Sequence, residues 1–187
     1  TEDASSSYYK EQLHVFEKSI ALFEEFGVRA RYRHAAASAA TLMFPSTHFN
    51  MVRWGIGLYG LYPSEVVQSR TLHNTKLRPV LTWKTRVAQV KIVPTGGTIG
   101  YNRTFSALQA MKIAVLPVGY WDGYDCGLSN KGSVLIRGKK CSVVGNICMN
   151  MCMVDVTGMP GVEAGDEAVL LGRQGSREIT AEEIAAK

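Results

Sequence analysis

The pattern of apolar residues changes near Leu77, and this change limits what the chain can fold into. Before it, from Ser7 to Phe26, apolar residues recur every three or four positions and Gly27 follows, which predicts an amphipathic helix with a glycine stop. After it, β-branched runs alternate with Gly and Pro turns, and these runs span residues 80–93, 112–117, 132–136, 142–144, 151–156 and 167–171. We therefore predict two domains: residues 1–76, of α/β type, and residues 77–187, mostly β.

The residue pattern of the first domain, 1–76, predicts short strands that alternate with a helix. The expected elements are a strand at 28–33, an Ala-rich helix at 34–43 and a buried strand at 51–54. Pro45 ends the helix, and the stretch 55–60 has too many glycines for a stable helix. This succession fits βα units better than a sandwich. At the other end of the chain, residues 179–187 predict a helix that is cut short.

Composition and charge exclude several classes of protein. The 187 residues are 46% hydrophobic and 20% charged, which is ordinary for a folded domain and argues against a disordered or fibrous chain. The net charge is +5, but the basic residues are scattered, so the charge alone does not indicate nucleic-acid binding. No apolar run approaches the roughly 20 residues of a membrane helix. The chain is also too short for a complete large barrel enzyme.

The cysteines and the N-terminus bear on where the protein works. The four cysteines, Cys126, Cys141, Cys148 and Cys152, form no CxxC pair, so we expect reduced thiols, a cytoplasmic protein and no metal site. Residues 1–7 lack the basic and apolar regions of a signal peptide. The chain begins without Met, and we expect it to be a segment of a longer protein.

Three glycine-punctuated stretches carry polar and aromatic side chains, at 100–105, 119–124 and 145–150. Loops held by a rigid sheet are common places for sites. Tyr101 and Tyr120 either anchor these loops as half-buried side chains or take part in proton transfer. The second role requires a nearby cation to lower the tyrosine pKa from about 10, and Arg103 is the local candidate.

The first half also contains a candidate anion site. Ser38 in a polar turn, together with the amides of Gly55 and Ile56 after a strand, can hold a phosphate, although a tight βα turn explains the same glycines. Arg53 lies in an otherwise apolar stretch, so we expect it to be buried and met by a carboxylate or a ligand. His34 is either a structural residue or a member of this site.

Six stretches of the sequence, at 34–40, 49–56, 58–60, 100–101, 116–123 and 147–149, match one family in order and spacing. They resemble the fold-type III alanine racemases. That family pairs an N-terminal (β/α)8 barrel, which binds pyridoxal 5'-phosphate, with a C-terminal β domain. The resemblance implies that residues 1–76 are the C-terminal part of the barrel and that residues 77–187 are the β domain, truncated at its end.

The resemblance also implies roles for single residues. Tyr101 resembles the tyrosine that transfers the substrate Cα proton in the active site of the partner subunit. Arg53 resembles the arginine that meets the pyridine nitrogen, and His34 the histidine that supports it. The other matches are Ser38, Gly55 and Ile56 for the cofactor phosphate, and Tyr120, Met149 and Asn150 for the substrate and its entrance. We therefore expect a homodimer with shared active sites and a small amino acid substrate.

Other positions depart from the family pattern. The lysine that carries the cofactor as a Schiff base belongs to a motif that does not occur in this chain, so we expect the chain to be inactive alone. Asn150, Asn146 and Cys126 stand where the family commonly has Asp, Arg and Arg. These three differences remove charges of both signs from the substrate entrance.

The resemblance thus implies a racemase that interconverts L-alanine and D-alanine by two-base Cα proton transfer, for supply of D-alanine to peptidoglycan. Two alternatives stay open. The first is a serine-tolerant racemase, suggested by the changed entrance. The second is a non-catalytic dimerisation or regulatory module derived from a racemase, suggested by the lysine motif that is not found.

Overall fold

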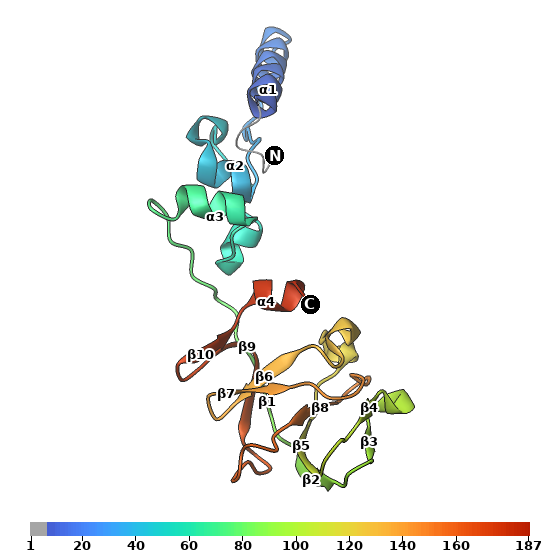
Figure 1. Ribbon diagram of the computed structural model, residues 1–187. Helices are drawn as coiled ribbons and strands as arrows, with labels where there is room; N and C mark the ends of the chain where they lie inside the picture. Colours follow the sequence, from blue (N-terminus) through green and yellow to red (C-terminus); the bar gives the residue numbers. More distant parts are fainter. Residues whose placement is uncertain (1–6) are drawn as a thin grey trace. The chain divides into compact units, whose positions relative to one another are not determined.

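The computed structural model describes residues 7–187, which divide into two compact units (Figure 1). The N-terminal unit ends at Val80, and the C-terminal unit spans Leu81–Lys187. Residues 1–6, which make up most of the stretch considered for a signal peptide, lie outside the described residues. No helix within residues 7–187 is both long enough and apolar enough to cross a membrane.

The N-terminal unit is built from helices and loops. Its elements are α1 (Tyr8–Glu25), α2 (Ser38–Met43), α3 (Glu65–Thr71) and two 3-10 helices, η1 (Pro45–Thr47) and η2 (Ile56–Tyr59). The first predicted helix is confirmed as α1, and Gly27 follows it at φ +76°, a conformation that favours glycine. The Ala-rich helix is confirmed in its second half as α2, which ends before Pro45. No prediction covers α3.

The two strands predicted in this unit do not form. Residues 28–33 carry no strand, and residues 51–54 hold only an isolated parallel bridge between Ala37 and Arg53. A strand needs a repeated ladder of bonds, and this bridge supplies a single one from Arg53 N–H to Ala36 O at 2.8 Å. Arg53 is also exposed, not buried as predicted. The glycine-rich stretch forms one 3-10 turn, η2, which Gly60 ends at φ +76°.

The C-terminal unit is mostly β, as predicted, and its strand pairs are antiparallel. One sheet has the order β1-β9-β6-β7 with β10 also paired to β9, a second has the order β2-β5-β8, and β3 pairs with β4. The strands are β1 (Trp83–Arg86), β2 (Gln89–Val93), β3 (Thr98–Ile99), β4 (Phe105–Ser106), β5 (Met111–Leu116), β6 (Ser133–Ile136), β7 (Lys139–Ser142), β8 (Cys152–Asp155), β9 (Glu167–Gln174) and β10 (Arg177–Ile179). The predicted C-terminal helix is confirmed as α4 (Ala181–Ala185).

Two of the predicted runs differ from the strands that form. The run 80–93 divides into β1 and β2 because the chain changes sheets, where Val87 N–H donates to Asp166 O at 2.8 Å and Ala88 N–H to Val115 O at 2.9 Å. The run at 142–144 is replaced by β7 at 139–142. Arg137 and Gly138, at φ +49° and +73°, form a two-residue turn that pairs β7 with β6 from its first residue.

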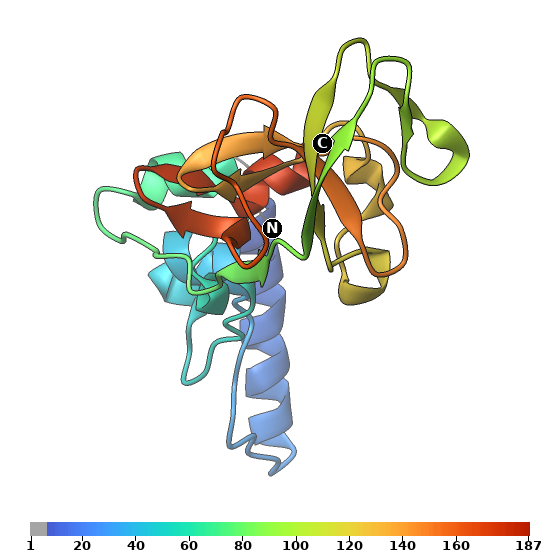
Figure 2. The same ribbon diagram turned by 90° about the horizontal axis from the view of Figure 1, so that it is seen from below.

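The core of the C-terminal unit packs side chains from both larger sheets and holds the loops between them. Its members include Leu116 and Val154 from the three-stranded sheet and Val134 and Leu170 from the other. Tyr124 is buried in this core, edge-on to Trp83, and burial raises the pKa of its phenol, so it stays neutral. The segment from β3 to β4, in yellow-green, projects from the rest of the unit in both views (Figures 1 and 2). Residues 101–104, in the turn between these strands, are exposed.

Candidate active site

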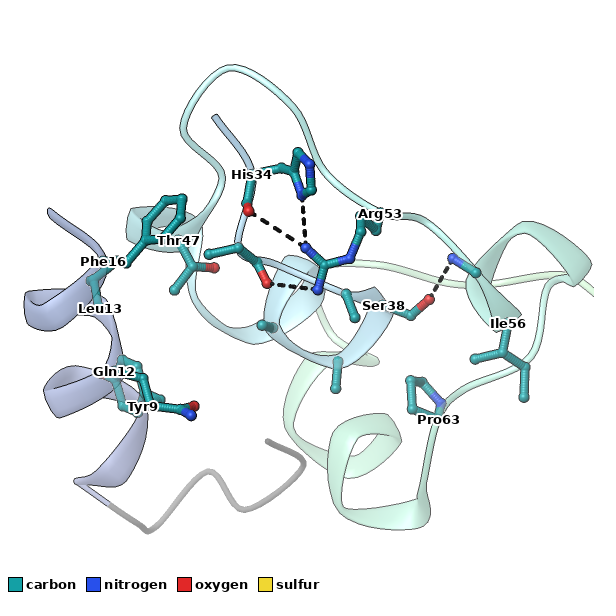
Figure 3. A pocket seen from close by; sticks show the side chains of 15 residues that line it. Tyr9, Gln12, Leu13, Phe16, His34, Ser38, Thr47, Arg53, Ile56 and Pro63 are labelled. Carbon is teal, nitrogen blue, oxygen red and sulfur yellow. Dashed lines mark hydrogen bonds between the residues drawn. The ribbon is translucent and has the colours of Figure 1, made fainter. Parts of the chain in front are cut away.

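Each unit holds one cavity in which candidate residues meet. The cavity of the N-terminal unit has a volume of about 730 Å³ (Figure 3). On one side it is lined by α1, through Tyr9, Gln12, Leu13 and Phe16, and on the other by residues of the predicted site, including His34, Ser38, Arg53, Gly55 and Ile56. Two ring contacts hold α1 in place, since Tyr9 stacks on Phe44 and Phe16 meets Phe49 edge-on.

Arg53 is held by acceptors that carry no charge. Its Nη1 donates to His34 Nδ1 at 2.8 Å and to the His34 carbonyl at 3.5 Å, and its Nη2 donates to the Ala35 carbonyl at 3.3 Å. A guanidinium has only donors, so Nδ1 of His34 is the acceptor and the ring proton lies on Nε2. These bonds use Nη1 and Nη2 and leave the Nε–H of Arg53 for a further acceptor. Of the two partners expected for this arginine, a carboxylate or a ligand, no carboxylate is among its hydrogen-bond partners in the described residues.

Ser38 connects the start of α2 with η2. Its side chain is 5% exposed, and its oxygen accepts from Gly55 N–H at 3.0 Å and from Gly57 N–H at 3.3 Å. A hydroxyl oxygen has two lone pairs and one hydrogen, so the hydrogen is left to donate to a third group. Ile56 N–H, at the first position of η2, has no partner available inside that helix. The structure therefore brings together the three predicted phosphate residues.

The charges around this cavity suit an anion. Arg53 is its one lining guanidinium, and no Asp or Glu is among the described residues that line it. With the hydroxyl and amide donors on the same wall, the cavity offers hydrogen bonds and positive charge together. A phosphorylated, heteroaromatic cofactor fits this donor set, because the Ser38 hydroxyl and the Ile56 amide suit phosphate oxygens and the Arg53 Nε–H suits an unprotonated ring nitrogen.

The second cavity, of about 700 Å³, lies in the C-terminal unit. It is lined by Tyr101, Tyr120, Cys126, Ser129, Asn146, Ile147, Cys148 and Met149. Three predicted substrate or catalytic residues thus share it, namely Tyr101, Tyr120 and Met149. Asn150 is exposed and does not line it, and Arg103, the expected cation beside Tyr101, does not line it either.

Tyr101 begins a 3-10 turn, η3 (Tyr101–Arg103), and Gly100, which precedes the turn, lies against Gly145 and Asn146. Gly100 lies at φ +82°, and a Cβ added there would meet Asn146 N at 2.6 Å and Gly145 Cα at 2.9 Å. We call this backbone contact the Gly100–Gly145 joint. Gly145 itself lies at φ +78°, so both members need glycine for conformation and for space.

Side-chain hydrogen bonds reinforce the joint. Thr104 Oγ1 donates to Asn146 Oδ1 at 2.8 Å, and Asn130 Oδ1 accepts from Gly145 N–H at 2.6 Å. The sequence gives little sign of these roles. Thr104 lies in one of the glycine-punctuated stretches, but no sequence pattern points to Asn130, whose φ of +58° is known only from the structure. Gly57 was also not predicted as a site residue, and it is a donor to Ser38.

A second backbone contact sets Tyr120. Its N–H donates to Cys148 O at 3.1 Å, and the next amide, of Trp121, donates to Met149 O at 2.9 Å. Asp122 Oδ2 accepts from Gly119 N–H at 3.0 Å and closes the short helix η4 (Tyr120–Asp122). The stretch 119–124 therefore folds as a capped turn that places Tyr120 in the cavity. Tyr101 is 71% exposed, so much of its phenol is free to contact another molecule.

The comparisons with known proteins agree over the whole chain. Residues 80–187 match the family model described as "Alanine racemase, C-terminal domain", and residues 1–63 match "Alanine racemase, N-terminal domain". The chain is 43% identical over 192 residues to the alanine racemase of Leptospira interrogans, covering 99% of this chain and 49% of that protein. It is 47% identical over 179 residues to that of Carboxydothermus hydrogenoformans, covering 96% of this chain and 48% of that protein.

Solved structures give the same result. The alanine racemase from Bacillus anthracis with bound L-Ala-P has a TM-score of 0.90 and 36% identity, over 100% of this chain and 47% of that one. The alanine racemase from Bartonella henselae with covalently bound pyridoxal phosphate has a TM-score of 0.80 and 30% identity, over 99% of this chain and 48% of that one. The chain spans about half the length of the curated relatives it matches. It belongs to the alanine racemase family.

Proposed function

We propose that the protein containing this chain interconverts L-alanine and D-alanine, with pyridoxal 5'-phosphate as cofactor and with active sites shared between two subunits. The observation that carries the proposal is the cavity in which Arg53, supported by His34, lies on the same wall as Ser38, Gly55 and Ile56. Residues 1–76 would then be the last part of a cofactor-binding barrel. The free thiols suit a reducing compartment, and we place the protein in the cytoplasm, where D-alanine would be made for the cell wall.

The N-terminal unit would bind the cofactor. The Ser38 hydroxyl hydrogen and the Ile56 amide would donate to phosphate oxygens, and Gly55 and Gly57 hold the Ser38 oxygen in position for this. The chemistry that pyridoxal phosphate supplies when bound is electron withdrawal from the substrate carbon that loses its proton. The lysine that attaches the cofactor would have to come from a part of the protein other than this chain.

Arg53 would set how strongly that electron withdrawal acts. Its Nε–H is the donor available to the ring nitrogen, and a guanidinium keeps its own proton at any physiological pH. Arg53 would therefore leave a bound ring nitrogen unprotonated, which would restrain the electron withdrawal and favour return of the proton to the same carbon. His34 holds the guanidinium plane through Nδ1 at 2.8 Å and is a positioning residue.

Tyr101 would move the Cα proton on one face of the substrate. Its exposed phenol suits a site completed by a second subunit, and the Gly100–Gly145 joint fixes the turn from which it projects. Tyr120 and Met149 share its cavity and would contact the substrate at the entrance. Positioned acid–base groups of this kind contribute roughly 100- to 10,000-fold to a rate.

The test is Tyr101→Phe in the complete protein. Because only the phenolic oxygen is removed, we expect turnover of L-alanine to fall by about 100-fold or more, while the affinity for the cofactor stays unchanged. Tyr32→Phe is the matched control, since Tyr32 is also exposed, at 57%, but lines neither cavity. Turnover that survives in Tyr101→Phe would remove the proposed role, and absence of turnover in the unaltered complete protein would favour the non-catalytic module.

One observation favours a broader substrate range. Cys126 and Asn146, two of the positions that differ from the family pattern, both line the second cavity and leave it without a charged side chain among the described residues. We propose that this entrance admits serine as well as alanine. Rates for L-alanine and L-serine, measured separately and in competition on the complete protein, decide the matter, and a strict preference for alanine rejects it.

A further inference from the structure

Two of the four cysteines face the second cavity, and the other two do not. Cys126 and Cys148 both line it, and Cys126 is exposed. Cys141 and Cys152 are 2% and 0% exposed and belong to the core of the C-terminal unit. Burial raises the pKa of the Cys141 thiol to about 11 and that of Cys152 to about 12, so these two stay protonated and unreactive at neutral pH. The accessible thiols are therefore a pair in one place.

Both accessible thiols lie along the same short piece of backbone. Cys126 Sγ is 3.9 Å from the Ile147 carbonyl oxygen, and Cys148 Sγ is 3.7 Å from the Asn146 carbonyl oxygen. These two carbonyls belong to neighbouring residues, so each sulfur atom lies within 4 Å of the 146–148 backbone. The thioether of Met149 lines the same cavity. The wall thus presents three sulfur-bearing side chains and no carboxylate among the described residues.

We propose that Cys126 and Cys148 form a dithiol site that captures a thiophilic centre able to bind two thiolates, the class that includes trivalent arsenicals. Soft sulfur ligands select such centres over hard cations. A zinc site is not indicated, because residues 7–187 contain no group of three or more His, Cys, Asp or Glu that could hold a metal ion. Two ligands suffice for a trivalent arsenical that already carries one carbon substituent.

The binding step balances without an oxidant. An aryl arsine oxide reacts with two thiols, so that two S–H bonds break, two As–S bonds form and the arsenic-bound oxygen leaves as water. Arsenic stays trivalent and neither sulfur is oxidised. The cavity, of about 700 Å³, has space for an aryl group, and Ile147 and Met149 offer it apolar contacts.

The second As–S bond distinguishes this dithiol site from a single reactive cysteine. Once one thiol has reacted, the other lies in the same cavity, so the second bond forms intramolecularly. Chelation of this kind raises affinity by about 100-fold or more over a single attachment. A bound aryl arsine would also occupy the cavity shared by Tyr101 and Tyr120, and would block their access to a substrate.

Phenylarsine oxide is the probe. On the complete protein we expect an adduct at Cys126 and Cys148 that survives washing with a monothiol and is released by a dithiol, as located by mass spectrometry of proteolytic peptides. Cys126→Ser and Cys148→Ser should each lower the apparent affinity by about 100-fold, and the matched control Cys141→Ala should not. Thermal unfolding checks that each variant is folded.

Other outcomes overturn the proposal. The first is a stable adduct that persists equally in both serine variants. The second is an adduct located at other cysteines, and the third is that no adduct resists washing with a monothiol. Binding of the arsenical does not depend on the proposed function. A second measurement does depend on it: racemase turnover should be lost when the reagent is added and should recover when a dithiol is added. An adduct at both thiols in a protein that shows no turnover would keep the dithiol site and reject the function.

Discussion

Arg53 shows how a single residue can keep its charge available. Its three acceptors are a neutral imidazole nitrogen and two carbonyl oxygens, so no carboxylate cancels the guanidinium charge within the described residues. The sequence predicts that this arginine has a special partner, because an arginine in an apolar stretch is unusual. It does not predict exposure, since that depends on which segments pack against the arginine in the fold. The outcome is an oriented cation that faces the cavity.

At this scale we predict the effect of Arg53→Lys in the complete protein. A lysine keeps the charge but cannot donate to three acceptors in the fixed directions of a guanidinium. Loss of charged hydrogen bonds costs about 1.5–3 kcal/mol, which corresponds to roughly a tenfold or larger rise in the dissociation constant of the cofactor. Titration of cofactor absorbance measures this. Arg29→Lys, at an exposed arginine that lines neither cavity, is the control, and equal affinities in the two variants would contradict the role.

At the scale of elements, the turn η3 depends on hydrogen bonds to a distant segment. Thr104→Val keeps the β-branched shape but removes the hydroxyl that donates to Asn146 at 2.8 Å. We expect the stability of the C-terminal unit to fall by about 1 kcal/mol, and kcat to fall more than KM changes, because Tyr101 is less well held.

Thr104→Ser separates positioning from packing. It restores the hydroxyl, so kcat should recover even though a methyl group is lost. Thr98→Val, at an exposed position of β3, is the matched control and should change neither constant. An unchanged kcat in Thr104→Val would show that Tyr101 is held by the Gly100–Gly145 joint alone.

The elements also show what the sequence can predict. The helices α1 and α4 and most strands of the C-terminal unit follow from local periodicity and glycine positions. The change of sheets at Val87 does not, because it depends on carbonyls of Asp166 and Val115, far away in the chain. The strand expected at 28–33 has no ladder partner in the described residues, and hydrophobic pattern cannot supply one.

The candidate site divides in the same way. Ser38, Gly55, Ile56, Arg53 and His34 could be predicted from their resemblance to a family, and the structure brings them into one cavity. Gly57 and Asn130 could not, because a backbone amide and a remote amide side chain leave no pattern in the sequence.

At the scale of the whole molecule, the proposed sharing of sites has a genetic consequence. Arg53 and Tyr101 lie in different units, and each lines a separate cavity. If each site takes Arg53 from one subunit and Tyr101 from the other, an Arg53→Ala chain and a Tyr101→Phe chain together form one intact site per mixed dimer. Random assembly in equal amounts should restore about a quarter of the parent activity.

The measurement is turnover after the two inactive variants are expressed together, with each variant alone and a double variant as controls. The double variant paired with either single variant provides no intact site and should stay inactive. No recovery in the mixed dimers would mean that Arg53 and Tyr101 of the same chain act together, and would reject the shared arrangement.

The Gly100–Gly145 joint limits how this protein can evolve. Every single-nucleotide change that replaces glycine introduces an amino acid with a side chain. At Gly100 or Gly145, the Cβ of that side chain would collide with the backbone of the other segment of the joint. Neither codon can therefore drift by one missense step, and a compensating change at the other cannot make room. We therefore expect functional copies of this gene to retain both glycine codons.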